Sequence, residues 1–235
     1  MSPFLGEFIG TALLITMGAG VVANVVLSKT KGQNSGWIVI TFGWAMAVFL
    51  GVYASNKLGG SGHLNPAVTI GLAVFGDFDA SLLGTYLAAQ FSGAFTGAVI
   101  AWLAYKQHFD ETADKDLKLA VFCTGPAIRN PLYNLLTEII GTFILLFGAL
   151  NMSKSASTLG ALDALPVALL VLGIGLSLGG PTGYAINPAR DLGPRIAHFI
   201  LPIIGKRDSD WGYAWIPVAG PIIGGLLAAG LFKLI

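Results

Sequence analysis

Long apolar stretches alternate with short polar breaks along the whole chain. Six stretches have the length of about 20 residues that a helix needs to cross the hydrocarbon core of a bilayer. They cover roughly residues 4–27, 36–55, 81–105, 131–151, 163–180 and 212–233. Two further apolar stretches, at about 66–76 and 188–200, are shorter. A helix of about 10 residues covers about 15 Å, or half of the bilayer core. The pattern therefore predicts six membrane spans and two half-helices.

Both half-helices begin at the same tripeptide, Asn65-Pro66-Ala67 and Asn187-Pro188-Ala189, and each follows a glycine-rich run. Asn is a preferred N-cap residue and Pro is favoured at the first helical position, while glycine permits irregular backbone before them. Because the amide oxygen of each Asn caps its own helix, we expect its NH2 group to be free to donate elsewhere. Irregular backbone at membrane depth is tolerated only beside protein or a water-filled cavity. The two half-helices therefore predict a cavity.

The two halves of the chain also resemble each other outside the tripeptides. Glu7-Phe8-Ile9-Gly10-Thr11 lies in the first span, and Glu138-Ile139-Ile140-Gly141-Thr142 lies in the fourth. Since each half has three spans, an odd number, the second half must cross the membrane upside down relative to the first. We predict an all-α membrane fold, with six transmembrane helices and two re-entrant half-helices in an inverted 3+3 repeat.

This repeat predicts a single channel domain over residues 1–235. Its first repeat covers about residues 1–105, and its second covers about 131–235. Residues 106–130 connect them and include the charged run Asp110–Asp116, which is typical of a solvated loop.

Composition agrees with a membrane protein. Hydrophobic residues make up 54% of the chain and charged residues only 11%, with a mean hydropathy of +0.75. Soluble domains carry about 25% charged residues. The net charge of +1 gives no reason to expect nucleic-acid binding. Cys123, as the single cysteine, excludes an intramolecular disulfide. Since the histidines lack metal-ligand spacing and the sequence has no nucleotide-binding or metalloprotease motif, we expect no metal, no cofactor and no enzymatic activity.

Basic residues do not settle the orientation. If both termini are cytoplasmic, the cytoplasmic segments hold only Lys57, Lys154 and Lys233, and the remaining Lys and Arg residues of the loops lie on the opposite side. The positive-inside rule favours the reverse arrangement.

Two Asn-Pro-Ala copies that open half-helices, with Arg190 and Asp191 directly after the second, resemble the aquaporin and aquaglyceroporin family. The resemblance covers essentially the whole chain. Within the family, the presence of Asp191 directly after Arg190 resembles the bacterial glycerol facilitators. It implies a passive channel in the bacterial plasma membrane for glycerol, dihydroxyacetone, urea, small undissociated acids and water. It also implies a homotetramer in the lipid bilayer, each protomer with its own pore.

The centre of such a pore follows from the half-helices. Each presents about half an elementary positive charge at its N-terminus, so two ends that meet at mid-depth repel cations and hydronium. Asn65 and Asn187 would donate to a passing water or hydroxyl oxygen, which turns the protons of that molecule outward and interrupts proton hopping. The carbonyls of Gly62, His63, Gly183 and Tyr184 would line the path as acceptors.

Arg190 is the second expected anchor, because a guanidinium inside a membrane is expensive and indicates function. The resemblance implies that it forms the narrowest filter with Trp44, Gly175 and Tyr184. Water-specific members carry His at the position of Gly175, where Gly widens the opening. Trp44 and Tyr184 would contact the carbon skeleton of a polyol, and Arg190 its hydroxyls. Glycerol facilitators usually carry Phe at the position of Tyr184, so the Tyr184 hydroxyl would either narrow the filter or bind solute.

Three acidic residues are expected to brace the loops. Glu7 and Glu138 would accept bonds from the backbone N–H groups of the glycine-rich runs, and Asp191 would hold Arg190 or its loop.

A water-selective channel is the alternative within the family, and glycerol flux separates the two. A coupled secondary transporter also uses broken helices, but it needs an ionisable coupling site and would depend on an ion gradient.

Overall fold

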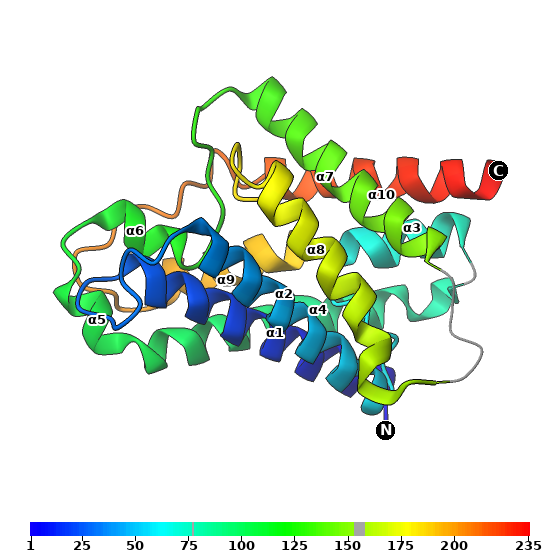
Figure 1. Cartoon of the computed structure of the whole chain (residues 1–235), viewed down its shortest axis with the longest axis horizontal. Helices are drawn as coiled ribbons and strands as arrows, with labels where there is room; N and C mark the ends of the chain where they lie inside the picture. Colours follow the sequence, from blue (N-terminus) through cyan, green and yellow to red (C-terminus); the bar gives the residue numbers. More distant parts are fainter. Residues whose placement is uncertain (77, 153–157) are drawn as a thin grey trace.

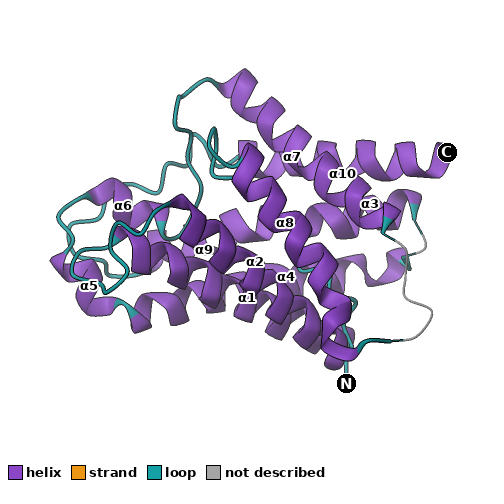
Figure 2. Cartoon of the chain, in the orientation of Figure 1, coloured by secondary structure: helices purple, strands orange, loops and turns teal. Residues whose placement is uncertain are grey.

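The computed structural model describes residues 1–76, 78–152 and 158–235, and every regular element in these ranges is a helix (Figure 2). The first repeat contains four longer helices. They are α1 (Pro3–Val26), α2 (Trp37–Lys57), α3 (Pro66–Phe75) and α4 (Leu83–Ala104), the last preceded by the 3-10 turn η1 (Ala80–Leu82). The second repeat contains α7 (Pro131–Asn151), α8 (Leu165–Leu178) after η2 (Gly160–Ala164), α9 (Pro188–Ile200) and α10 (Ile216–Leu234).

Six helical segments in the described residues are long and apolar enough to cross a membrane. They lie where the apolar pattern predicts them, although the last begins at Ile216 and therefore four residues later than the expected 212. Both termini lie at one end of the molecule, opposite α5 (Lys106–Glu111) and α6 (Lys115–Ala120) (Figure 1). An even number of spans accounts for this arrangement.

Each repeat packs its first helix against its last, α1 against α4 and α7 against α10. Small residues permit the close approach. A Cβ added at Gly93 would stand 2.4 Å from the Phe8 carbonyl oxygen, and one at Gly224 would stand 2.3 Å from the Ile139 carbonyl oxygen. Helices in lipid associate by such close packing.

The half-helices join the two repeats. α3 of the first repeat packs on α10 of the second, and α9 of the second repeat packs on α4 of the first. Each half-helix is thus held by the opposite repeat, and their N-termini meet inside the bundle.

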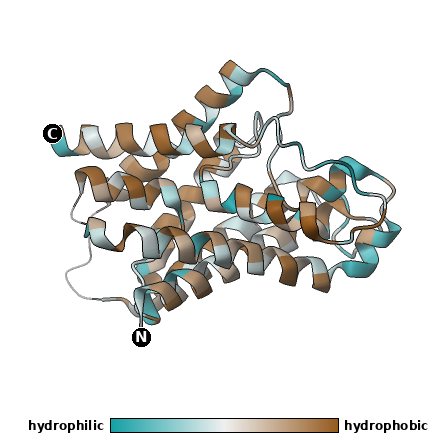
Figure 3. Cartoon of the chain, turned by 180° about the vertical axis from the view of Figure 1, so that it is seen from behind, coloured by the Kyte–Doolittle hydropathy of each residue, from teal (hydrophilic) through white to brown (hydrophobic). Residues whose placement is uncertain are grey.

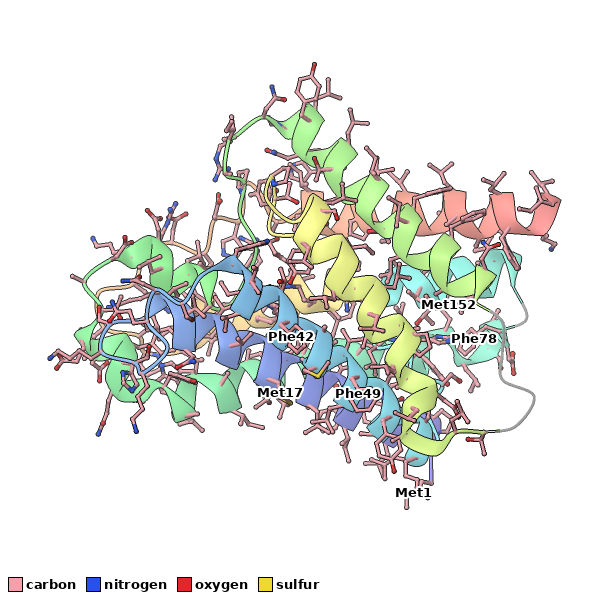
Figure 4. All side chains as sticks on the ribbon, in the orientation of Figure 1. Met1, Met17, Phe42, Phe49, Phe78 and Met152 are labelled. Carbon is pink, nitrogen blue, oxygen red and sulfur yellow. The ribbon has the colours of Figure 1, made fainter. Side chains whose placement is uncertain are left out.

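Hydrophobic positions predominate along the long helices, and hydrophilic positions gather at the end that carries α5 and α6 (Figure 3). Met17 of α1 and Phe42 of α2, both labelled in Figure 4, remain 39% and 53% exposed. Exposed side chains of this kind along membrane-length helices fit contact with lipid.

The connection between the repeats differs from the predicted solvated loop. Its acidic run is mostly exposed, as expected, but the chain there forms α5 and α6. Residues 121–124 then turn inward and are buried, with Val121 and Phe122 each only 1% exposed. The charge run dominated the prediction, whereas the apolar residues after it decide where the segment packs.

Candidate functional site

The two Asn-capped helix ends contact each other directly. In each copy the side-chain oxygen accepts from the N–H of the following Ala, at 2.9 Å for Asn65 and 3.0 Å for Asn187. The Asn65 Nδ2 donates to the Ile186 carbonyl, and the Asn187 Nδ2 donates to the Leu64 carbonyl, both at 2.8 Å. Each NH2 group thus donates outside its own helix, as expected, and its partner is a backbone carbonyl of the opposite repeat. An amide nitrogen carries two hydrogens, and the opposite repeat takes one, so that one hydrogen per Asn remains for another acceptor.

The backbone before each Asn adopts an unusual conformation. Leu64 and Ile186 have φ values of 51° and 44°, in the left-handed region that bulky or β-branched residues avoid. Such strain persists only where the surroundings fix it. The same two residues supply the carbonyls that accept from the opposite Asn.

A buried carboxylate fixes each of these turns. Glu7 accepts from the backbone N–H of His63 at 3.1 Å and of Leu64 at 2.8 Å. Glu138 accepts in the same way from Ala185 at 3.0 Å and Ile186 at 2.8 Å. Glu7 also accepts from the side chains of Ser55 and Gln90, and Glu138 accepts from Thr182. The two carboxylates thus make equivalent contacts in the two repeats.

Two cavities inside the bundle share part of their lining. The terminus-side cavity, of about 150 Å³, lies next to the C-terminal part of α7 and the first residues of α8. The loop-side cavity, of about 270 Å³, lies next to residues 123–127. Trp44, Tyr184 and Arg190 line both cavities. These three side chains therefore lie where the two cavities adjoin, and we refer to this point as the constriction.

The lining of the terminus-side cavity combines polar and apolar residues. Gly62, His63, Asn65 and Asn187 belong to it. Most of the lining is apolar and includes Val48, Val52, Leu145, Val167 and Val171. Gly183 lines the loop-side cavity instead. The His63 ring is turned to its own half-helix, since its Nδ1 lies 3.1 Å from the Thr69 Oγ1.

Arg190 follows the second tripeptide and reaches the constriction from the first turn of α9. Its Cζ lies 4.1 Å from the centroid of the Trp44 ring, within the range of a cation–π contact. Its Nη1 donates to the Phe122 carbonyl at 3.3 Å. The residue is only 7% exposed. The guanidinium is therefore held between an aromatic face and a backbone carbonyl of the connecting segment.

Gly175 lies behind Tyr184 and is not among the described residues that line either cavity. A Cβ at position 175 would stand 2.9 Å from the Tyr184 Cζ and 3.1 Å from its hydroxyl oxygen. That hydroxyl is buried and has no hydrogen-bond partner among the described residues. The phenol end thus fills the space that the glycine leaves. The roles of Gly175 in widening the opening and of the Tyr184 hydroxyl at the filter stay predictions, to which the geometry adds that Gly175 leaves room for the Tyr184 ring.

Asp191 does not bind Arg190 but a residue that the sequence reasoning missed. Its Oδ1 accepts from the Arg195 Nε at 2.8 Å, and both side chains are fully buried. Its Oδ2 accepts from the Thr124 backbone N–H and hydroxyl at 2.8 and 2.7 Å. The spacing of Asp191 and Arg195, one helical turn apart in a membrane half-helix, was the available signal.

The chain matches the Major intrinsic protein family over residues 1–232. It is 60% identical over 233 residues to a probable glycerol uptake facilitator protein of Thermotoga maritima, covering 99% of each chain. It is 54% identical over 225 residues to the glycerol uptake facilitator protein of Bacillus subtilis, covering 96% of this chain and 81% of that relative. The aquaglyceroporin of Plasmodium falciparum has a similar structure, with a TM-score of 0.86 at 32% identity, over 99% of this chain and 95% of that one. With its six apolar spans, this chain is a multi-pass integral membrane protein, and it belongs to the Major intrinsic protein family.

Proposed function

We propose that this protein is a passive channel of the bacterial plasma membrane that conducts glycerol, other small neutral solutes and water. The observation that carries the proposal is the constriction, where the Arg190 guanidinium lies over the Trp44 ring between two cavities. The names of the bacterial relatives, glycerol uptake facilitators, support glycerol as the solute.

The constriction suits a linear polyol because its walls are chemically unlike. A guanidinium has five N–H donors, and the hydrogen bond to Phe122 occupies one of them. The others would serve two neighbouring hydroxyls, while Trp44 and Tyr184 contact the carbon skeleton. Gly175 would act through Tyr184, by leaving room for its ring. Conduction needs several sites of moderate affinity rather than one tight site.

On both sides of the constriction, backbone carbonyls would line the path of the solute. The backbone carbonyls of Gly62, His63, Gly183 and Tyr184 would accept from its hydroxyls. At mid-depth, the remaining N–H of Asn65 and of Asn187 would donate to its oxygens. The loop bracing that we assign to Glu7, Glu138 and Asp191 would keep these groups in register.

Protons and ions would be excluded by three positive features. The two half-helix N-termini each present about half an elementary charge, and both face the meeting point of Asn65 and Asn187. Arg190 adds a full charge at the constriction. A cation would have to give up its hydration beside these groups, whereas a neutral solute exchanges hydrogen bonds with the wall.

Dihydroxyacetone, urea and small undissociated acids have the size and neutrality that this path requires. We further propose that the two repeats form one channel domain and that four copies assemble in the bilayer. In that assembly each copy would keep its own pore, since the two half-helices meet within one chain.

Liposomes that contain the purified protein test the proposal by stopped-flow measurement of water and glycerol fluxes. We expect glycerol flux well above that of empty liposomes and independent of proton or sodium gradients. Water flux with negligible glycerol flux would indicate a water-selective channel. Glycerol uptake that requires an ion gradient would indicate a coupled transporter.

A further inference from the structure

The buried Asp191–Arg195 pair anchors the connecting segment next to the constriction. Asp191 holds the Thr124 N–H and hydroxyl, and Arg195 donates from its Nη2 to the Thr124 carbonyl at 3.0 Å. Asp191 thus binds both donors of Thr124, and Arg195 binds its carbonyl; we call this arrangement the clamp. Arg195 also donates from its Nη1 to the carbonyls of Ser209 and Asp210, at 2.7 and 3.1 Å. The pair therefore ties two loops to α9.

Phe122 lies two residues before this clamp and is 1% exposed. Its carbonyl accepts from the Arg190 Nη1, so the position of the clamped segment decides where that acceptor stands. Arg190 and Asp191 are neighbours in the sequence, and α9 carries Arg195 one turn further on. The contacts thus run from Arg190 through Phe122 and Thr124 back to Asp191 and Arg195 on the same helix, α9.

The pair also affects the charge at the constriction. In the described part of the chain, the hydrogen-bond partners of the Asp191 carboxylate are Thr124 and Arg195, and Arg190 is not among them. Arg195 therefore engages the carboxylate that stands next to Arg190 in the sequence. The Arg190 donors stay available for solute instead of being held in an ion pair.

We propose that Thr124, Asp191 and Arg195 are positioning residues for selectivity. They hold the Phe122 carbonyl where it fixes the Arg190 guanidinium over Trp44, and Arg195 keeps Asp191 from pairing with Arg190. A buried ion pair costs desolvation and is a poor source of stability by itself, whereas a fixed guanidinium serves the two-hydroxyl contact of a polyol. This inference rests on the proposed glycerol channel and names what sets its constriction.

The test compares glycerol and water fluxes of single variants in liposomes. Thr124→Val removes the hydroxyl but keeps the shape and the backbone N–H. Thr124→Ser keeps a hydroxyl and loses only the methyl group. Arg195→Lys keeps the charge but loses the fork that reaches Thr124. Thr137→Val is the matched control, because the Thr137 hydroxyl donates to the Tyr133 carbonyl of its own helix at 2.9 Å on an exposed face.

We expect Thr124→Val and Arg195→Lys to lower the ratio of glycerol to water flux by about threefold to tenfold, within the range for one ordinary hydrogen bond in a protein. Glycerol needs two aligned donors and water needs one, so water flux should fall less. Thr124→Ser and Thr137→Val should keep the wild-type ratio. The ratio is the readout because the amount of folded protein does not affect it.

A wild-type ratio in Thr124→Val would overturn the inference, as would equal losses of both fluxes or failure of Thr124→Ser to restore the ratio. If Arg195→Lys does not fold, Thr124→Val decides alone. Wild-type liposomes without glycerol flux would refute the proposed function itself, and the inference would fall with it. Wild-type glycerol flux with an unchanged Thr124→Val ratio would refute only the positioning role.

Discussion

Substitution of Gly175 by Ala is expected to close the constriction to glycerol through Tyr184. The new Cβ would stand 2.9 Å from the Tyr184 Cζ, closer than side chains tolerate, and 3.0 Å from the Thr41 Cγ2, a tight contact. Thr41 lies in α2 and its hydroxyl donates to the Ile38 carbonyl, which restrains its movement. Tyr184 belongs to a loop and borders both cavities. The ring should therefore yield, and the cavities are where it has room to move.

The magnitude follows from the cost of overpacking, about 1 to 3 kcal/mol. A solute that has to push the ring back adds this energy to its barrier, which corresponds to about a fivefold to 150-fold loss of glycerol flux. Water is smaller and should lose less. Gly175→His should act in the same direction and more strongly. The assay is stopped-flow flux of both solutes in liposomes of matched protein content.

Gly173→Ala is the control for this experiment. Gly173 lies in the same helix, and in the described chain a Cβ added there would project into open space. Its flux should match the wild type. The double variant Gly175→Ala with Tyr184→Ala should recover glycerol flux, because the overlapping ring is gone. Wild-type flux in Gly175→Ala, or equal losses of glycerol and water, would refute this reasoning.

Three further outcomes are expected. Asn187→Ala should destabilise the protein by about 1 to 3 kcal/mol, because it removes a helix cap and the hydrogen bond to the Leu64 carbonyl; thermal unfolding in detergent measures this, and an unchanged midpoint would contradict it. Glu138→Gln should lower the melting temperature by about 2 to 12 °C, because an amide NH2 would face the Ile186 N–H that the carboxylate now accepts; a wild-type melting curve would count against the bracing role. Burial raises the pKa of the Cys123 thiol, so little thiolate exists at neutral pH, and a maleimide should label the native protein far more slowly than the denatured one; equal rates would contradict this.

The spans and half-helices could be predicted because two simple physical rules govern them. A helix that crosses hydrocarbon needs an apolar length, and the tripeptides mark the starts of α3 and α9 by capping preference alone. The meeting of Asn65 and Asn187 followed from the inverted repeat, since three spans per half force the two tips to approach from opposite faces.

Contacts between distant segments were beyond such rules. Nothing in the sequence next to Phe122 indicates that its carbonyl meets Arg190, because that bond depends on where the connecting segment turns inward. Gly175 was assigned through the family resemblance alone, and its contact with the Tyr184 ring depends on a loop conformation with positive φ. Arg195 could have been noticed by its spacing from Asp191, although the role of the pair becomes visible only with Thr124 beside it.

The reciprocal hydrogen bonds between the two tripeptide regions also limit how early during synthesis the centre of the pore can assemble. Asn65 finds its partner carbonyl 121 residues later in the chain, and Asn187 closes the second bond only after its own half-helix exists. A ribosome that adds about 5 to 20 residues per second needs about 6 to 24 s to produce that carbonyl. During this interval the N-terminal half must remain at the translocon or in the bilayer with an unfinished interior. Completion of the pore is thus among the last events of biogenesis, and a nascent chain released early cannot hold its own centre together.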